Sequence, residues 1–257
     1  MSNETFFEHP LNERIRTFLR LEHLFEKVEF FRYDPSPWAT RAAIDGLLDI
    51  IAITGRSDIK SELIKEIERN LATLNRMRRQ PQVDTKTLNE IVHQLEDDHQ
   101  GLMQMIGPIG ATTRDHELLK SIAQRSSIPG GACSFDLPFY HYLLTKPIEQ
   151  RTQQIKHWMI DLEPVSDAIG LILSLARTSA SPRSIVAHQG FFQEAVDSSA
   201  PAQLLRIGLE PSLPFFPEIS GHKNRFSIRF LTSVNEATQR PIQTSDDIAF
   251  TLTCCVF

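Results

Sequence analysis

Hydrophobic residues recur every three to four positions over the first ~105 residues, the spacing that places them on one side of an α-helix. Proline and glycine interrupt this pattern at Pro35, Gly55 and Pro81, where a helix is expected to break or end. Helices separated by such short breaks pack most simply as an antiparallel bundle. The predicted helices cover residues 11–31, 38–54, 57–78 and 84–105.

Shorter helices and then strands are predicted in the rest of the chain. Helices are expected at 116–125, 136–144, 147–162 and 164–177, and the last has an almost wholly apolar interior that favours burial against other helices. After Ser179 the period falls to two, which predicts strands at 184–196, 204–209, 225–231 and 248–254. Pro211, Pro214, Pro217 and Gly221 are interpreted as turn residues between these strands.

This order of elements predicts an α+β protein with two domains. Residues 1–115 and 152–178 are expected to form a discontinuous helical bundle domain. Residues 116–151 and 179–257 are expected to form a smaller domain rich in antiparallel β-sheet.

Charge and apolar residues alternate strictly in one of the predicted strands. Phe226, Ile228 and Phe230 fall on one face, which is expected to be buried, and cations fall on the opposite face. We call Lys223, Arg225 and Arg229 the basic strip. Two interpretations remain open from the pattern alone. The strip either keeps an exposed strand soluble, or it docks an acidic partner.

Further cations are candidates for the same surface. Arg16 and Arg20 are four residues apart on the first predicted helix, so they are neighbours of like charge, and Glu13 can supply a carboxylate. Arg56 lies in the short connection between two helices, and His222 precedes the strip as a possible hydrogen-bond donor to a carboxylate. For each of these residues a solvated, self-paired surface is the alternative interpretation.

Composition limits the classes of function. The 257-residue chain has a formal net charge of −5, so bulk electrostatics do not favour nucleic acid, and any basic surface is local. The odd set of cysteines, Cys133, Cys254 and Cys255, is a poor disulfide framework and favours a reducing cytoplasm. No apolar run approaches the ~20 residues of a membrane span, and the acidic N-terminus does not resemble a signal peptide. A soluble cytoplasmic protein is expected.

Catalytic and metal-binding patterns are weak. His93 and His99 lie on one predicted helix but face apart, and Cys254 and Cys255 alternate across a strand, so neither pair favours a metal. Cys133 and His141 form at most an incomplete thiol–imidazole arrangement, without an orienting residue or an oxyanion hole. We therefore expect no cofactor, no metal and no enzymatic activity.

Three motifs occur in order along the chain: FEHPLNER at 7–14, SIPGG with CSFDLP at 127–138, and SGHK with RF and IRF at 220–230. Taken together, they resemble the ZapD family of bacterial cell-division proteins. The resemblance runs in order from Phe7 to the pair Cys254–Cys255. It implies a cytoplasmic, non-enzymatic homodimer with a helical domain and a β domain.

The resemblance also implies a partner and a binding surface. Proteins of this family bind the C-terminal tail of FtsZ, the tubulin-like division GTPase, and crosslink its filaments in the Z ring. Carried over residue by residue, the basic binding surface comprises Arg56, Arg225 and Arg229, with Arg20, Arg16, Lys223 and His222 as neighbours. A nucleic-acid-binding module that uses the same basic strip is the alternative; the net charge and the expected lack of stacking aromatics on that face weigh against it.

Overall fold

The computed structural model describes residues 4–55, 58–78, 84–196, 202–222, 225–232 and 240–256. They form two compact units. The first, which we call the sandwich unit, combines Met1–Leu19 with Leu173–Phe257, and the second, the helical unit, comprises Arg20–Ile172. The predicted α+β class is confirmed by helices together with antiparallel sheets.

The unit boundaries differ from the predicted domains. Residues 116–151 were expected with the strands, but they are largely helical and fall in the helical unit. The helices are α1 (Glu13–Phe31), α2 (Pro37–Thr54), α3 (Ile59–Met77), α4 (Thr85–Gln104), α5 (Ala111–Asp115), α6 (Glu117–Ser126), α7 (Pro138–Leu144), α8 (Ile148–Met159) and α9 (Glu163–Thr178). Among these, only the five-residue α5 was not predicted from the sequence.

Local signals in the sequence set several helix ends. The side chain of Ser36 accepts a hydrogen bond from Trp38 N at the start of α2, and Gly55 closes the same helix. Asp84 caps α4 as predicted, accepting from Lys86 N at 3.0 Å. Ser57, the predicted cap of α3, lies outside the described residues. The helices α3 and α4 are antiparallel, because Lys60 near the start of α3 donates to Met105 O at the end of α4.

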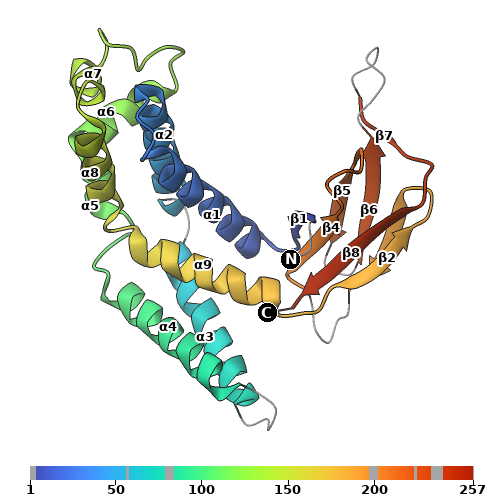
Figure 1. Ribbon diagram of the computed structural model, residues 1–257. Helices are drawn as coiled ribbons and strands as arrows, with labels where there is room; N and C mark the ends of the chain where they lie inside the picture. The colour runs from blue at the N-terminus through green and yellow to red at the C-terminus, as the bar shows by residue number, and fades with distance from the viewer. Residues whose placement is uncertain are drawn as a thin grey trace. The chain divides into compact units, whose positions relative to one another are not determined.

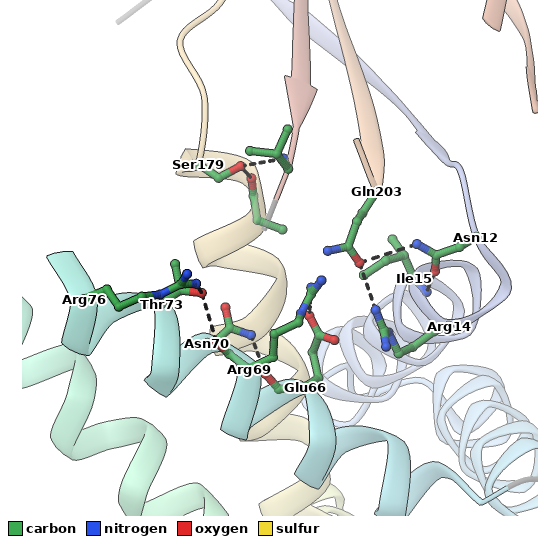
Figure 2. Close-up of polar contacts among 12 residues, drawn as sticks. Asn12, Arg14, Ile15, Glu66, Arg69, Asn70, Thr73, Arg76, Ser179 and Gln203 are labelled. Atoms are coloured by element: carbon green, nitrogen blue, oxygen red, sulfur yellow. Dashed lines mark hydrogen bonds and ion pairs between the residues drawn. The ribbon is translucent and has the colours of Figure 1, made fainter. Parts of the chain in front are cut away.

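Several buried polar side chains of the helical unit form hydrogen bonds or ion pairs with other groups of the same unit. The guanidinium of Arg151, only 4% exposed, donates to the carbonyl oxygens of Pro35, Ser36 and Lys146. On α3, Glu66 forms an ion pair with Arg69, and Asn70 donates to Glu66 O at 2.7 Å (Figure 2). Hydrogen bonds of this kind offset the cost of removing polar groups from water.

The strands of the sandwich unit form two antiparallel sheets, drawn mainly in orange and red in Figure 1. One sheet has the order β1-β4-β8-β2 and the other the order β3-β6-β5, with β7 also paired to β6. The strands are β1 (Thr5–Pro10), β2 (Arg183–Ala187), β3 (Phe191–Ala195), β4 (Leu204–Leu209), β5 (Phe215–His222), β6 (Arg225–Thr232), β7 (Ile242–Gln243) and β8 (Ile248–Cys255).

The core of this unit lies between the two sheets. Phe226, Ile228 and Phe230 of β6 belong to the same buried cluster as Leu205 and Ile207 of β4. Aromatic rings from the two sheets meet there, with 5.1 Å between the ring centroids of Phe230 and Phe250. The apolar residues that alternate along β6 in the sequence therefore face the core between the two sheets.

The predictions about strands were incomplete. The segment 184–196 was expected as one strand, but it is two strands, β2 and β3, that belong to different sheets and are joined by a turn with positive φ at Gln189 and Gly190. The strands β1, β5 and β7 were not predicted. Pro217 and Gly221 suggested turns, yet β5 is an edge strand, where the missing N–H of a proline is tolerated.

The first turn of α1 is fastened to the strands of its own unit through Gln203, which is 5% exposed (Figure 2). Its side-chain oxygen accepts from Arg14 Nη2 at 3.1 Å, and its backbone N–H donates to Cys255 O at 2.7 Å.

Of the helices that the structure describes, none is long and apolar enough to cross a membrane.

Candidate functional site

The alternation predicted for the basic strip is present in β6. Phe226 is 1% exposed, and Ile228 and Phe230 are fully buried, whereas Arg225 and Arg229 are exposed. The pleat of the strand therefore directs both guanidinium groups away from the core. We call the solvent-facing side of β3, β6 and β5 the outer face.

The strand register defines the neighbours of the two arginines. Residues paired across antiparallel strands project to the same side of a sheet. Arg229 pairs with Phe191 on β3 and with Glu218 on β5. The outer face therefore places a phenyl ring, 42% exposed at Phe191, beside a guanidinium. Such a face suits a peptide that carries both carboxylates and apolar side chains.

The two arginines differ in their partners. Arg229 forms an ion pair with Glu218, and both side chains are about half exposed. Among the described residues, Arg225 makes no ion pair and no side-chain hydrogen bond. An exposed ion pair contributes about 0–1 kcal/mol, so Glu218 is a weak competitor for Arg229. Arg225 is the better placed of the two to receive an external carboxylate.

Distance keeps the two charges nearly independent. Four residues along a strand correspond to about 13 Å, slightly more than the Debye length of about 10 Å at 0.1 M salt. The arginines repel each other little at this separation. A ligand that binds both Arg225 and Arg229 must therefore span about 13 Å, either as an extended chain or with two separate acidic groups.

The Gly221 end of β5 packs closely against the segment before α1. A Cβ on Gly221 would overlap Leu11 Cδ2 and would lie 3.2 Å from His9 Cδ2, so a larger residue there would require the Leu11 side chain to move. Burial, helped by the positive charge of Arg16, holds the pKa of His9 below its usual value. Arg16 is therefore near His9, and His9 is near the strand end that pairs with β6. Gly221 pairs with Phe226, which faces the core, so this contact does not bring Arg16 onto the outer face.

The remaining predicted site residues are less well defined. Arg56 and Lys223 lie outside the described residues, and of His222 only the backbone is described, paired with Arg225. Arg20 is exposed on α1 but belongs to the helical unit. Arg16 binds Glu13 within α1 at 3.1 Å, which confirms the predicted partner.

Two members of the outer face were missed in the sequence. Phe191 is the first of two adjacent phenylalanines, and alternation alone requires one of such a pair to face outward. Glu218 was hidden because Pro217 and Gly221 were interpreted as turn residues. The expectation that this face lacks aromatic side chains is wrong, since Phe191 lies on it.

The described residues do not form the catalytic or metal-binding arrangements that the sequence raised as alternatives. The thiol of Cys133 donates to Asp136 Oδ2 at 3.2 Å rather than forming the imagined pair with His141. His93 faces Asp97 at 3.6 Å on the same helix. Across the ranges that the structure describes, no group of three His, Cys, Asp or Glu residues could hold a metal ion.

Comparison with known proteins identifies the family. The family model described as ZapD, cell division protein, matches residues 19–229. A cell division protein ZapD from Methylococcus capsulatus is 43% identical over 256 residues, covering 100% of both chains. The chain belongs to the ZapD family.

Other ZapD proteins align over nearly the same length. The relative from Nitrosomonas europaea is 38% identical over 97% of this chain and 94% of its own. The relative from Aromatoleum aromaticum is 37% identical over 97% of this chain and 96% of its own. Membership in the ZapD family supports a role in cell division, and these names state no reaction.

Proposed function

We propose that this protein is a non-enzymatic division factor that binds the C-terminal tail of FtsZ through the outer face of β6. As a homodimer it would crosslink and bundle FtsZ filaments and so stabilise the Z ring at mid-cell. The observation that carries the proposal is Arg225, which is exposed and has no ion-pair partner among the described residues. The opposite face of its strand, β6, is buried in the core.

Arginine on a rigid strand suits the capture of a disordered acidic tail. A guanidinium can bind a carboxylate through two parallel hydrogen bonds, and β6 holds it in place without further ordering. The tail loses conformational entropy on binding, so the affinity of a single site should be modest. The neighbouring Phe191 offers apolar contact area to the same segment.

Bundling requires two such sites on one particle. A symmetric dimer presents the outer face twice, and filaments that display many tails convert weak binding into avidity. The apolar stripes of α3 and α9 are the first candidates for a dimer surface. Several of their apolar residues, among them Leu63, Ile67 and Ile169, are fully buried within one chain. A dimer contact would therefore use other residues of these helices or other elements.

The test is co-sedimentation with GTP-assembled FtsZ, beside FtsZ that lacks its C-terminal tail. We expect the protein to pellet with full-length filaments and to stay in the supernatant with tailless ones. Sedimentation equilibrium of the protein alone checks for the dimer. Equal pelleting with tailless filaments would move the contact to the globular body of FtsZ and refute the assigned ligand.

Binding is expected to weaken with salt. Raising the salt from about 0.05 M to about 0.3 M shortens the Debye length, and the affinity for a tail peptide should fall about tenfold because exposed charges carry the contact. Fluorescence anisotropy of a labelled tail peptide measures this change. An affinity that does not depend on salt would point to an apolar groove instead.

Removing the internal competitor should strengthen binding. Glu218→Gln frees Arg229, and because exposed ion pairs contribute at most about 1 kcal/mol, the peptide affinity should rise about two- to fivefold. Glu210→Gln makes the same change of charge at another exposed site of the sandwich unit and serves as the control. Equal gains for both variants would mean that only net charge matters.

The alternative of a nucleic-acid-binding module uses the same face. Phe191 could stack on a base, but the net charge of −5 disfavours a polyanion. Competition decides between the two. Excess DNA should not displace the labelled tail peptide, and displacement at equal nucleotide and peptide concentrations would favour the nucleic-acid alternative.

A further inference from the structure

A groove runs between α1 and α9 in the helical unit. It has a volume of about 840 Å³, and all of its lining residues fall within Arg20–Ile172. The lining residues recur every three to four positions, on α1 from Glu22 to Phe30 and on α9 from Glu163 to Gly170. Residues at that spacing share one side of a helix, so the groove follows the two helix axes.

Carboxylates dominate the lining of this groove. Five of them face one guanidinium, and they belong to Glu22, Glu26, Glu29, Glu163 and Asp167. The guanidinium is that of Arg32, which Glu29 already holds at 2.8 Å. Among the described residues, Glu26, Glu163 and Asp167 make no ion pair. Charge complementarity therefore favours a cationic ligand.

The negative charge also acts on the neighbouring helix α4. A Cβ on Gly101 of α4 would lie 3.8 Å from Pro164 Cβ, so α4 passes beside the start of α9. Burial, and then the charges of Asp167 and Asp97, raise the pKa of Asp98 on α4 to about 6. A cationic ligand beside Asp167 therefore relieves part of this repulsion.

Two exposed aromatic rings lie at the end of α1 and line the groove. Phe30 is 74% exposed and Tyr33 is 59% exposed. Phe30 meets Phe31 edge to face with 5.1 Å between the ring centroids, and the guanidinium of Arg32 lies 4.6 Å from the ring centroid of Tyr33. Exposed apolar side chains rimmed by polar ones are typical of protein-binding surfaces. The groove thus offers apolar contact as well as charge.

The α9 side of the groove carries small residues. Ser166 is small, Gly170 has no side chain, and a Cβ on Gly170 would meet nothing within 4 Å among the described residues. A partner helix can therefore approach α9 closely. Two helices that lie side by side leave a groove that a third helix can fill, as in a helical bundle.

We propose that this groove binds an amphipathic helix of a partner protein, with lysine or arginine residues beside its apolar stripe. The stripe packs on Phe30 and on Phe25 and Met159, which are 6% and 8% exposed, and the cations reach the carboxylates of both helices. The groove is independent of the proposed contact with FtsZ, because it lies in the other unit and has the opposite charge. For one short helix we expect a Kd of about 10–100 µM.

The test is a titration of the whole protein with a labelled peptide of leucine and lysine whose leucines lie on one side of the helix. A length of about 15 residues gives a helix of about 22 Å, longer than the stretch of about 12 Å from Glu22 to Phe30. Fluorescence anisotropy measures the affinity. A scrambled peptide of the same composition should bind at least about tenfold more weakly, because it lacks a continuous apolar stripe. Equal affinity for the two peptides, or no binding up to ~1 mM, would overturn the proposal.

Variants with matched controls locate the site. Phe30→Ala should weaken binding of the striped peptide about three- to tenfold, whereas Phe135→Ala, which removes an exposed ring elsewhere in the helical unit, should leave it unchanged. Glu26→Gln should weaken binding about two- to fivefold, and Glu90→Gln on the exposed side of α4 is its control. Equal effects of a variant and its control would place the peptide outside the groove and refute the proposal.

A second copy of this chain is the competing occupant. Gly170→Leu fills the open space on α9, so the affinity for the striped peptide should fall at least about tenfold while the thermal unfolding midpoint does not drop. Sedimentation equilibrium of the same variant decides between the two occupants. An oligomeric state unchanged from the wild type supports the proposal. A shift toward monomers would assign the groove to a contact between copies, and the proposal would be wrong.

Discussion

Replacing Arg225 with glutamate is expected to abolish the bundling of FtsZ filaments while the fold stays intact. The side chain is exposed and has no ion-pair partner among the described residues, so its loss removes no internal bond. Reversal of the charge turns attraction for a carboxylate into repulsion, and single-site affinity should fall at least about tenfold. Bundling needs both sites of a dimer at once, so the effect on filaments is larger than on one peptide.

Light scattering and co-sedimentation measure the loss of bundling, and thermal unfolding checks the fold. Lys86→Glu is the matched control, because it makes the same change of charge on α4, where a carboxylate in the first helical turn is favourable. Arg229→Glu should also abolish bundling, although it places two carboxylates opposite each other with Glu218. Retained bundling by both Arg225→Glu and Arg229→Glu would refute the outer face as the binding surface.

Phe226→Ala is expected to destabilise the sandwich unit by about 3–5 kcal/mol. Phe226 is 1% exposed and packs in the same cluster as Phe230 and Phe250, so its removal leaves a cavity between the sheets. Denaturant unfolding followed by far-UV circular dichroism measures the change.

Phe191→Ala on the neighbouring strand is the control for that variant, since it removes the same ring from an exposed position of the same sheet. Its effect should be well below about 2 kcal/mol, because a partly exposed ring loses less on truncation. An unchanged unfolding midpoint for Phe226→Ala, or equal losses in both variants, would overturn the assigned facing of β6.

The sequence was sufficient for elements whose side chains repeat over several turns or pairs. Alternation in β6 predicted both its buried and its exposed face, and Asp84 and Gly55 marked helix ends through their own local chemistry. The strand β1 was missed because its partner β4 is far away in the sequence, Thr5 pairing with Leu209. The strand β5 pairs with the next strand, β6, and was missed because Pro217 and Gly221 were interpreted as turn residues. Pro217 is compatible with β5 only because that strand lies at an edge.

The candidate site was likewise predictable only in part. Strand periodicity located Arg225 and Arg229, but the pairing of Arg229 with Glu218 depends on the register between two strands, which the sequence does not specify. The turn at Gln189 and Gly190 sends β2 and β3 into different sheets, so the position of Phe191 beside Arg229 depends on that turn. The register of the β5–β6 hairpin and the turn before β3, rather than strand periodicity alone, complete the outer face.

The pairing of β1 with β4 has a consequence for synthesis of the protein. Thr5 aligns with Leu209, and the residues of the helical unit are translated between them. At about 5–20 residues per second the ribosome needs about 10–40 s to make the intervening chain. During this time β1 has no partner strand, while the helical unit can already fold. The nascent chain is thus expected to complete its sandwich late, with Phe6 and Phe7 available to chaperones in the meantime.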